Sequence, residues 1–132
     1  MGTVLIVDDN EESIAAVRAL FEMCGVRVVA ARDGADAIVL LLQGLTPGLI
    51  VLDLMMEGMD GLTVCEILHA QPSTRNIPVI ILTAAVGEMA RLNSVSAGAA
   101  DFVSKPFSPG DLVRRVGHLL AVAPPKDADQ GR

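Results

Sequence analysis

The sequence predicts one α/β domain in which a doubly wound, five-stranded parallel sheet carries helices on both faces. Five short apolar segments alternate along the chain with five segments of helical periodicity. Right-handed crossovers return each strand in the same direction, so the carboxyl ends of all five strands share one edge. Polar residues directly follow four of the apolar segments, and we expect them to meet at that edge.

The first two strand–helix units occupy the amino-terminal third of the chain. Thr3 to Val7 is apolar and β-branched, and the polar run Asp8-Asp9-Asn10 after it is typical of a turn that caps a helix. That helix extends to Gly25, because apolar residues recur at helical spacing. These positions are Ile14, Val17, Leu20, Phe21 and Cys24. Arg27 to Ala31 predicts a second strand, and Ala35 to Gln43 predicts a second helix.

The third and fourth strands are both expected to be buried. Leu49 to Leu52 is a continuous apolar run, too short for an ordinary helix, and it ends at Asp53. Thr63 to His69 predicts the third helix. Val79 to Leu82 predicts the fourth strand, which ends at Thr83.

The last unit follows a fourth helix that extends to about Ala97 and is ended by Gly98. Asp101 to Ser104 predicts the fifth strand, and Lys105-Pro106 follows it directly. A fifth helix is marked by apolar residues at helical spacing. These are Leu112, Val116, Leu119 and Leu120.

Composition limits the choice of class. A chain of 132 residues that is 52% hydrophobic suits a single domain, expected over residues 1–121, with a polar, disordered tail or linker stub over residues 122–132. No apolar run approaches the roughly 20 residues that cross a bilayer, and we expect a cytoplasmic protein. Cys24 and Cys65 have no metal-ligand spacing and are expected to be reduced, partly buried packing residues.

Three carboxylates are expected close together at the shared edge, those of Asp8, Asp9 and Asp53. Carboxylates in a low dielectric repel one another, and a bound cation removes that repulsion. Mg²⁺ suits oxygen ligands of this kind beside a phosphate, and Mn²⁺ is an alternative. A carboxylate can also act as a nucleophile toward phosphorus, with Lys105 supplying positive charge to the transferred group. The edge therefore predicts a phosphoryl-transfer pocket.

Each of these residues also has a purely structural interpretation. The run Asp8-Asp9-Asn10 is typical of a turn and helix cap, and Asp53 is an ordinary strand end. Thr83 is β-branched and suits a strand, and a single lysine such as Lys105 is usually a solvated side chain. The functional interpretation is favoured because all of them occupy one predicted edge.

The chain resembles the receiver domain of two-component response regulators from about Thr3 to Leu120. The motifs that carry the resemblance are Val4-Leu5-Ile6-Val7-Asp8-Asp9-Asn10, Leu49-Ile50-Val51-Leu52-Asp53-Leu54-Met55-Met56, Met59-Asp60-Gly61, Ile80-Ile81-Leu82-Thr83-Ala84, Gly98-Ala99-Ala100-Asp101-Phe102 and Lys105-Pro106-Phe107. Their combination is highly specific. The resemblance implies a flavodoxin-like (βα)5 fold with strand order 2-1-3-4-5. It also implies a signalling domain that assists its own phosphorylation rather than an enzyme.

The resemblance further implies roles for the acidic residues. Asp53 would accept a phosphoryl group from a phosphohistidine of a histidine kinase or histidine phosphotransfer protein. Asp8 and Asp9 would hold Mg²⁺ together with Asp53. The backbone carbonyl of Met55 would complete the metal site, so the apolar side chain at this position is no objection.

The remaining site residues would form a switch. Thr83 and Lys105 would contact the phosphoryl oxygens, while Ala84 would leave the site open to the donor. Phe102 would turn inward as Thr83 moves toward the phosphoryl group, although a static core phenylalanine is the alternative. The Lys105-Pro106 peptide bond is often cis in this family.

The face formed by the fourth helix, the fifth strand and the fifth helix would then bind a downstream protein or output domain. Arg91, Arg114 and Arg115 fall on these segments, although a solvated surface explains them equally well. Direct contact with nucleic acid is not expected, because the net charge is −6 and the only aromatic residues are three phenylalanines.

Two features depart from the family pattern. Glu57 stands four residues after Asp53, where family members usually carry proline, so this loop is expected to be looser, and the Glu57 carboxylate would approach Lys105 or a metal-bound water. Met55 and Ala85 occupy positions that influence hydrolysis of the acyl phosphate in the family. Neither side chain orients a water molecule by hydrogen bonding, so we expect a slowly decaying phosphorylated state.

Three other classes compete with this interpretation. A phosphatase of the haloacid dehalogenase type would need a second acid where Met55 stands, and usually a cap domain. A receiver-like module that binds partners without phosphorylation would not need the complete set of polar residues at the edge. A flavin-binding protein would need a phosphate-cradling first loop, whereas the acidic run from Asp8 to Glu12 repels phosphate.

Overall fold

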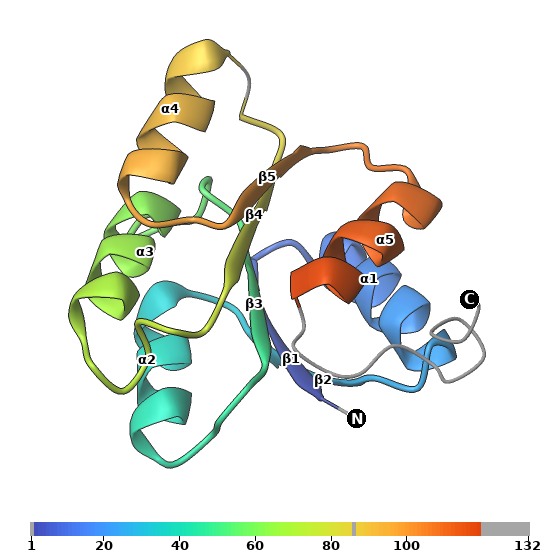
Figure 1. The fold of residues 1–132 in the computed structure, drawn as a ribbon, viewed down its shortest axis with the longest axis horizontal. Helices are drawn as coiled ribbons and strands as arrows, with labels where there is room; N and C mark the ends of the chain where they lie inside the picture. Colours follow the sequence, from blue (N-terminus) through green and yellow to red (C-terminus); the bar gives the residue numbers. More distant parts are fainter. Residues whose placement is uncertain (1, 86, 120–132) are drawn as a thin grey trace.

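The computed structural model describes residues 2–85 and 87–119, and its centre is a sheet of five parallel strands (Figure 1). The strands are β1 (Thr3–Val7), β2 (Arg27–Ala31), β3 (Leu49–Leu52), β4 (Val79–Thr83) and β5 (Asp101–Ser104). They lie in the order β2-β1-β3-β4-β5. The predicted fold class and strand order are both confirmed. The order reverses between β1 and β3, so the carboxyl ends of these strands border the crevice where sheets of this type bind ligands.

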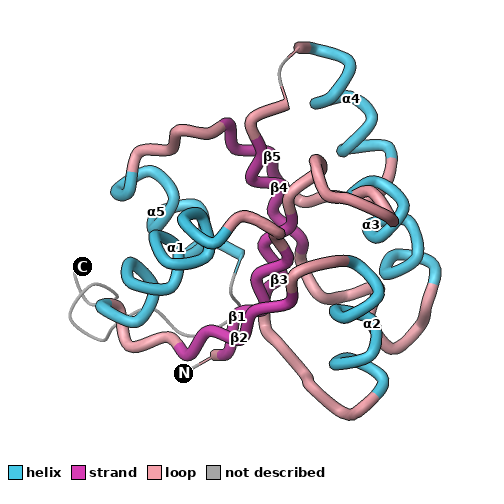
Figure 2. Tube along the Cα trace, turned by 180° about the vertical axis from the view of Figure 1, so that it is seen from behind, coloured by secondary structure: helices cyan, strands magenta, loops and turns pink. Residues whose placement is uncertain are grey.

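Helices cover both faces of the sheet. They are α1 (Glu11–Met23), α2 (Gly34–Leu42), α3 (Gly61–Ala70), α4 (Glu88–Ser96) and α5 (Pro109–Leu119). α1 and α5 lie side by side on one face, while α2, α3 and α4 lie on the other (Figures 1 and 2). Among the residues that the structure describes, no helix has the length and apolar character needed to span a membrane.

The sheet separates two hydrophobic clusters, because alternate residues of each strand point to opposite faces. Val4, Ile6 and Val51 pack beneath α1 and α5. Leu5 and Ile50 pack beneath α2 and α3. All four residues of β3 are buried, which explains why its sequence is continuously apolar rather than alternating.

Three helices on or near the functional edge begin at capping side chains. Asn10 accepts the backbone N–H of Ser13 at 2.9 Å, and Asp60 accepts that of Thr63 at 2.9 Å. Asp33 accepts the N–H of Asp36 in the same way. Each cap satisfies a backbone donor that the first turn of a helix leaves free. The cap at Asp60 also explains why α3 begins at Gly61, two residues earlier than the sequence pattern predicts.

The expectation for Cys24 is wrong. Cys24 is the C-cap residue of α1 and is exposed rather than partly buried, whereas Cys65 is buried. Burial raises the pKa of the Cys65 thiol to about 11, so this cysteine is an inert packing residue. Leu120 and the predicted tail over residues 122–132 lie outside the described residues.

Candidate functional site

The backbone ladder of the sheet extends one residue beyond the strands and positions the residues of the acidic edge. The N–H of Asp8 donates to the carbonyl of Ala31 at 3.0 Å, and the N–H of Asp53 donates to that of Val7 at 3.0 Å. The N–H of Lys105 donates to the carbonyl of Thr83 at 2.8 Å. The main chain of these residues is therefore as constrained as that of the strands themselves.

The three predicted carboxylates converge. Asp8, Asp9 and Asp53 each offer a carboxylate oxygen, and these oxygens lie within 4.8 Å of one another. Asp8 and Asp53 are buried, with 2% and 6% of their surface exposed, while Asp9 is exposed. Hard oxygen ligands beside an opening to solvent are the arrangement that Mg²⁺ favours, because this ion retains several water molecules. The residues present fit a Mg²⁺ site.

Lys105 reaches into the same site from the end of β5. Its ammonium nitrogen lies 2.8 Å from Asp8 Oδ2 and 3.3 Å from Asp53 Oδ2. The ammonium also donates to the hydroxyl oxygen of Ser13, 2.9 Å away on the first turn of α1. The sequence predicts Lys105 at this edge, but it does not predict its contact with Ser13.

Burial and charge act in opposite directions on these groups. Burial raises the pKa of the Asp8 carboxyl, and the neighbouring Asp53 adds to that effect, while the hydrogen bonds from Lys105 and Asn10 only partly offset it. For Lys105, burial favours the neutral amine, but the bonds and charges of Asp8 and Asp53 together outweigh burial and raise the pKa of the ammonium. The lysine therefore stays charged between the two carboxylates at neutral pH.

The loop after β3 approaches the site through its backbone. The N–H of Met55 donates to Asp53 Oδ1 at 3.1 Å, while the Met55 side chain is 60% exposed. The N–H of Glu57 donates to Asp9 Oδ2 at 3.3 Å. The expected approach of the Glu57 carboxylate to Lys105 is not observed, since the described partners of that ammonium are Asp8, Ser13 and Asp53. A proline at position 57 would lack the N–H that contacts Asp9.

Gly61 allows α3 to start directly against the acceptor strand. A Cβ atom at this position would lie 2.2 Å from the backbone oxygen of Asp53 and 2.7 Å from the Cα of Leu54. Both atoms belong to the main chain and cannot rotate away. Only glycine fits, and its N–H donates to the carbonyl of Leu54 at 3.2 Å.

Thr83 and Ala84 lie beside the acidic residues at the end of β4. Thr83 is completely buried, and its hydroxyl oxygen accepts the N–H of Ala85 at 3.2 Å. Ala84 is exposed and presents no bulk at the entrance. The proposed contact of Thr83 with a phosphoryl oxygen stays a prediction, as does the use of the Met55 carbonyl as a metal ligand.

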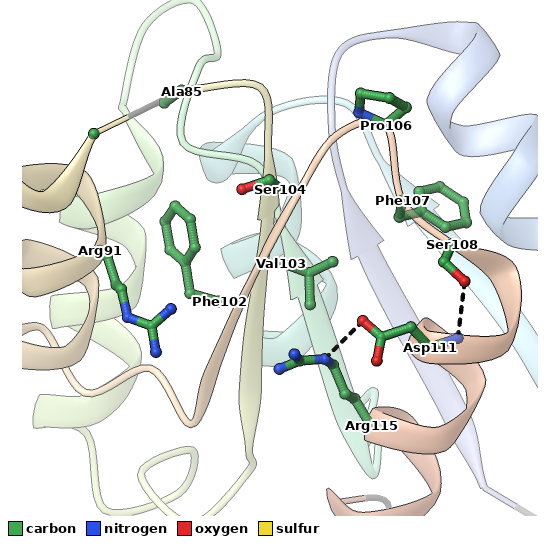
Figure 3. A pocket seen from close by; sticks show the side chains of 11 residues that line it. Ala85, Arg91, Phe102, Val103, Ser104, Pro106, Phe107, Ser108, Asp111 and Arg115 are labelled. Atoms are coloured by element: carbon green, nitrogen blue, oxygen red, sulfur yellow. Dashed lines mark hydrogen bonds and ion pairs between the residues drawn. The ribbon is translucent and has the colours of Figure 1, made fainter.

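Phe102 is partly buried and lines a cleft of about 410 Å³ between α4, β5 and α5 (Figure 3). Its ring points toward α4 beside Arg91, and Arg115 and Asp111 lie across the cleft on α5. Arg115 donates to both oxygens of Asp101, at 2.7 and 2.8 Å, and to Asp111 at 3.0 Å. We call this region the α4–β5–α5 cleft.

The arginines in this region have different surroundings. Arg91 is exposed and lines the α4–β5–α5 cleft, and Arg114 pairs with Asp111 on the same helix. Arg115 pairs with Asp101 and Asp111, and the hydrogen bonds and charges of these two carboxylates raise the pKa of its guanidinium above the ordinary value. The peptide bond before Pro106 is cis, as expected.

Sequence reasoning missed Ser13 as a member of the site. Ser13 lies on the first turn of α1, three residues after its cap Asn10, and therefore close along the chain to the end of β1. The apolar periodicity of this helix does not reveal Ser13, because the residue is polar.

Comparison with known proteins agrees with this geometry. Residues 4–117 match the family model described as the response regulator receiver domain. Response regulator PleD of Caulobacter vibrioides is 40% identical over 116 residues, which cover 88% of this chain and 25% of PleD. The chain thus spans about a quarter of the length of that relative.

Two solved structures share the fold over nearly the whole chain. A putative response regulator from Chloroflexus aurantiacus is 33% identical with a TM-score of 0.86, and the match covers 92% of this chain and 98% of that one. The receiver domain of sensor histidine kinase PA1611 from Pseudomonas aeruginosa is 28% identical with a TM-score of 0.82, covering 92% and 98%. That structure has a magnesium ion coordinated in its active site cleft.

Proposed function

The chain belongs to the response regulator receiver domain family, the phosphoacceptor switches of two-component signalling, and we propose that Asp53 is the residue that becomes phosphorylated. The observation that carries this assignment is the position of Asp53, which is buried beside two further carboxylates and within 3.3 Å of the Lys105 ammonium. Asp8 already contacts Lys105 at 2.8 Å, and Asp9 is exposed. Asp53 directly follows β3, the central strand of the sheet, and lies beside the exposed Asp9.

In the proposed reaction, a carboxylate oxygen of Asp53 attacks the phosphorus atom of a phosphohistidine. A new O–P bond forms as the P–N bond breaks, and the electron pair of that bond returns to the imidazole nitrogen, which then takes up a proton from solvent. The donor is a histidine kinase or a histidine phosphotransfer protein. The receiver ends as an aspartyl phosphate, and the donor ends as neutral histidine.

Three carboxylates would hold the metal, those of Asp8, Asp9 and Asp53, together with the backbone carbonyl of Met55. Bound Mg²⁺ would neutralise negative charge on the oxygens of the transferred group. Burial and the neighbouring Asp53 raise the pKa of Asp8, which means that the charged carboxylate is disfavoured there. A cation at this position would be favourable, because the cation would offset the repulsion between the neighbouring carboxylates.

Lys105 and Thr83 serve the transferred group from two sides. The Lys105 ammonium already contacts Asp53 and would pair with a phosphoryl oxygen on that residue. The Thr83 hydroxyl would donate its hydrogen to another phosphoryl oxygen, because its oxygen is the acceptor in the bond from Ala85. Ala84 is exposed and leaves the approach of the donor open.

Movement of Thr83 toward the phosphoryl group would open space beneath β5, and Phe102 would fill it. Ser104 on β5 lies directly opposite Thr83 on β4. Phe102 lies two residues before Ser104 on β5, so it is the diagonal neighbour of Thr83. A rotation of Phe102 inward would reshape the α4–β5–α5 cleft, where a downstream protein or output domain would bind. We place this exchange of phosphoryl groups in the cytoplasm, where histidine kinases draw on ATP.

The test is the intact mass of the protein after incubation with Mg²⁺ and acetyl phosphate or phosphoramidate. We expect one added phosphoryl group that requires Mg²⁺ and is absent from Asp53→Asn. An adduct of equal yield in Asp53→Asn would place the acceptor elsewhere. Lack of an adduct at every time after mixing, in folded protein that binds Mg²⁺, would favour an interaction module that works without phosphorylation.

A further inference from the structure

A closed circuit of hydrogen bonds joins the start of α1 to the lysine of the acidic site. Asp8 Oδ1 accepts the N–H of Asn10 at 2.9 Å, and Asn10 Oδ1 accepts the N–H of Ser13 at 2.9 Å. The hydroxyl oxygen of Ser13 accepts a hydrogen from Lys105, and Lys105 returns to Asp8 through Oδ2. The helix cap and the ammonium are thus parts of one network, and Ser13 is the residue that connects them.

The ammonium of Lys105 uses its whole donor capacity in this network. A lysine ammonium has three N–H donors, and the structure provides three acceptors, on Asp8, Ser13 and Asp53, at 2.8, 2.9 and 3.3 Å. The Lys105 side chain is 17% exposed, so a missing acceptor would be replaced by water only in part.

The three acceptors differ in what phosphorylation does to them. In the proposed reaction, Asp53 would gain the phosphoryl group, and Asp8 would be a ligand for the cation. Both carboxylates therefore change their contacts during the proposed reaction. The Ser13 hydroxyl is neutral, takes no part in either role, and lies on a capped helix turn. It is the acceptor that can keep its contact with Lys105 throughout.

We propose that Ser13 is a positioning residue that holds the Lys105 ammonium in place for the phosphoryl group on Asp53. This inference rests on the proposed function of Asp53. Ser13 acts through Lys105 and would set how fast the acceptor is phosphorylated, without being a ligand for the metal.

The variant Ser13→Ala isolates this contact from the helix cap. The cap bond uses the backbone N–H of residue 13, which alanine retains, and alanine is a favourable residue inside a helix. Ser13→Thr restores the hydroxyl at the same place. Ser73→Ala removes an exposed serine in the segment between α3 and β4 and serves as the control for a serine-to-alanine change.

The first experiment measures the lysine contact itself and needs no phosphorylation. The sequence has two lysines, Lys105 and Lys126, so a nitrogen-15 spectrum of lysine ammonium groups has two signals, and Lys126→Arg assigns them. We expect the Lys105 ammonium to exchange its hydrogens with water several times faster in Ser13→Ala than in the wild type, and Ser13→Thr to restore slow exchange. Equal exchange in all three proteins would overturn the proposal.

The second experiment measures the phosphorylation rate with acetyl phosphate at saturating Mg²⁺. We expect Ser13→Ala to react about threefold to tenfold more slowly, the size expected for the loss of one ordinary hydrogen bond. Ser13→Thr and Ser73→Ala should react at the wild-type rate. Mg²⁺ affinity, measured by calorimetry, should change less than about twofold, because none of the three carboxylates is altered.

The outcomes separate this inference from the proposed function. Wild-type protein that forms no adduct contradicts the role of Asp53, while the exchange measurement still decides whether Ser13 holds Lys105. Wild-type protein that reacts normally, with Ser13→Ala at the same rate, overturns the role of Ser13 alone. Loss of Mg²⁺ affinity in parallel with the rate would indicate a general distortion of the site and would also overturn it.

Discussion

The acidic site lies at the carboxyl ends of the central strands β1 and β3, and the α4–β5–α5 cleft lies beside the edge strand β5. The two regions are held in different ways. The carboxylates of Asp8 and Asp53 are buried, their backbones continue the sheet ladder, and a partly buried lysine joins them. The α4–β5–α5 cleft is open, and its ion pairs, such as that of Arg115 with Asp101, are about one-third exposed.

The helix beside the acidic site is also more deeply buried than the helix beside the α4–β5–α5 cleft. α3, which starts against Asp53, buries Gly61, Val64, Cys65 and Leu68. α4 buries only Ser94 within its own length, and it begins after Gly87, which has no side chain to cap it. Its residues Met89, Leu92 and Val95 are at least half exposed.

This difference suggests that the acidic site is built to stay rigid and that the α4–β5–α5 cleft is built to change shape. The acceptor site must hold its groups in one geometry before the donor arrives, and the sheet ladder does so. The α4–β5–α5 cleft must change shape at low free-energy cost, and few buried contacts have to break there. Five predictions break or sharpen the comparison, beginning with the largest expected effect.

Gly61→Ala should be the most damaging of the small substitutions. Its Cβ would lie 2.2 Å from the backbone oxygen of Asp53, so the end of β3 or the start of α3 must shift. We expect a loss of about 3 kcal/mol in the free energy of unfolding. Gly117→Ala on α5 meets no atom within 4 Å, and a gain of up to about 1 kcal/mol is expected there. Urea unfolding followed by circular dichroism measures both, and equal effects would contradict the argument.

Lys105→Met removes the cation between two buried carboxylates and should destabilise the protein without added metal by about 2 kcal/mol. This is less than the roughly 3–5 kcal/mol expected for a fully buried pair, because the lysine side chain is 17% exposed. Arg115→Met removes a more exposed cation at the α4–β5–α5 cleft and should cost less than about 1 kcal/mol. Unfolding in urea at pH 7 and low salt compares the two variants. A larger loss from Arg115→Met would reverse the ranking of the two regions.

The pH dependence of stability should report on Asp8. Its folded-state pKa lies above the ordinary value of 3.8, chiefly because the carboxyl is buried. The folded protein therefore binds this proton more tightly than the unfolded chain does. The stabilisation from protonated Asp8 is complete below the unfolded pKa and is lost as the pH rises through the folded pKa.

Asp8→Asn keeps a neutral side chain at every pH, so it should lose less stability than the wild type as the pH rises above the ordinary aspartate pKa of 3.8. Urea midpoints measured at each pH without divalent cations provide the comparison. Parallel curves for the two proteins would show that Asp8 does not carry the raised pKa.

The phosphorylated state should decay slowly without a phosphatase, because neither Met55 nor Ala85 can orient an attacking water. Met55→Asn or Ala85→Glu should accelerate the loss of the phosphoryl group by about threefold to tenfold, since each introduces a group that hydrogen-bonds water. The decay is measured from the mass of the purified phosphoprotein. Rapid decay in the wild type that neither variant alters would rule out this explanation.

The smallest effect is expected at Glu57. Glu57→Pro removes the N–H that contacts Asp9 Oδ2. Because this hydrogen bond is long, at 3.3 Å, and exposed, its loss should weaken Mg²⁺ binding only about twofold to threefold. Glu57→Gln retains that N–H and should bind nearly as the wild type does. Calorimetry with both variants shows whether the backbone N–H or the side chain of Glu57 supports Mg²⁺ binding. Equally weak Mg²⁺ binding in both variants would assign the effect to the carboxylate.

Much of the fold was predictable because its signals are local. The ends of β1 and β3 follow from where continuous apolar runs meet aspartate, and the observed strands end at Val7 and Leu52, directly before those aspartates. Helix starts were less predictable. The pattern placed the third helix at Thr63, whereas the cap at Asp60 starts it at Gly61. Apolar periodicity does not register a cap, because a cap depends on one polar side chain.

Cys24 shows where periodicity misleads. It continues the apolar spacing of α1, but the helix has ended by that residue and Cys24 lies exposed at the cap. The spacing of a helix no longer describes which side a residue faces once the chain leaves the helix. Glu57 shows a different limit. Its place in the loop after Asp53 predicted that its carboxylate would approach Lys105, whereas its backbone N–H contacts Asp9 instead.

By itself, the sequence determined the alternation of strands and helices. It also determined which residues end β1, β3, β4 and β5. Both follow from local patterns of apolar and polar residues, because these patterns indicate which segments are buried. The tertiary structure alone decided which groups touch. Lys105 meets Ser13 across 92 residues of chain, and Glu57 meets Asp9 across 48. Such contacts depend on how two loops and a helix turn pack over the sheet edge, and the distance along the chain carries no information about that packing.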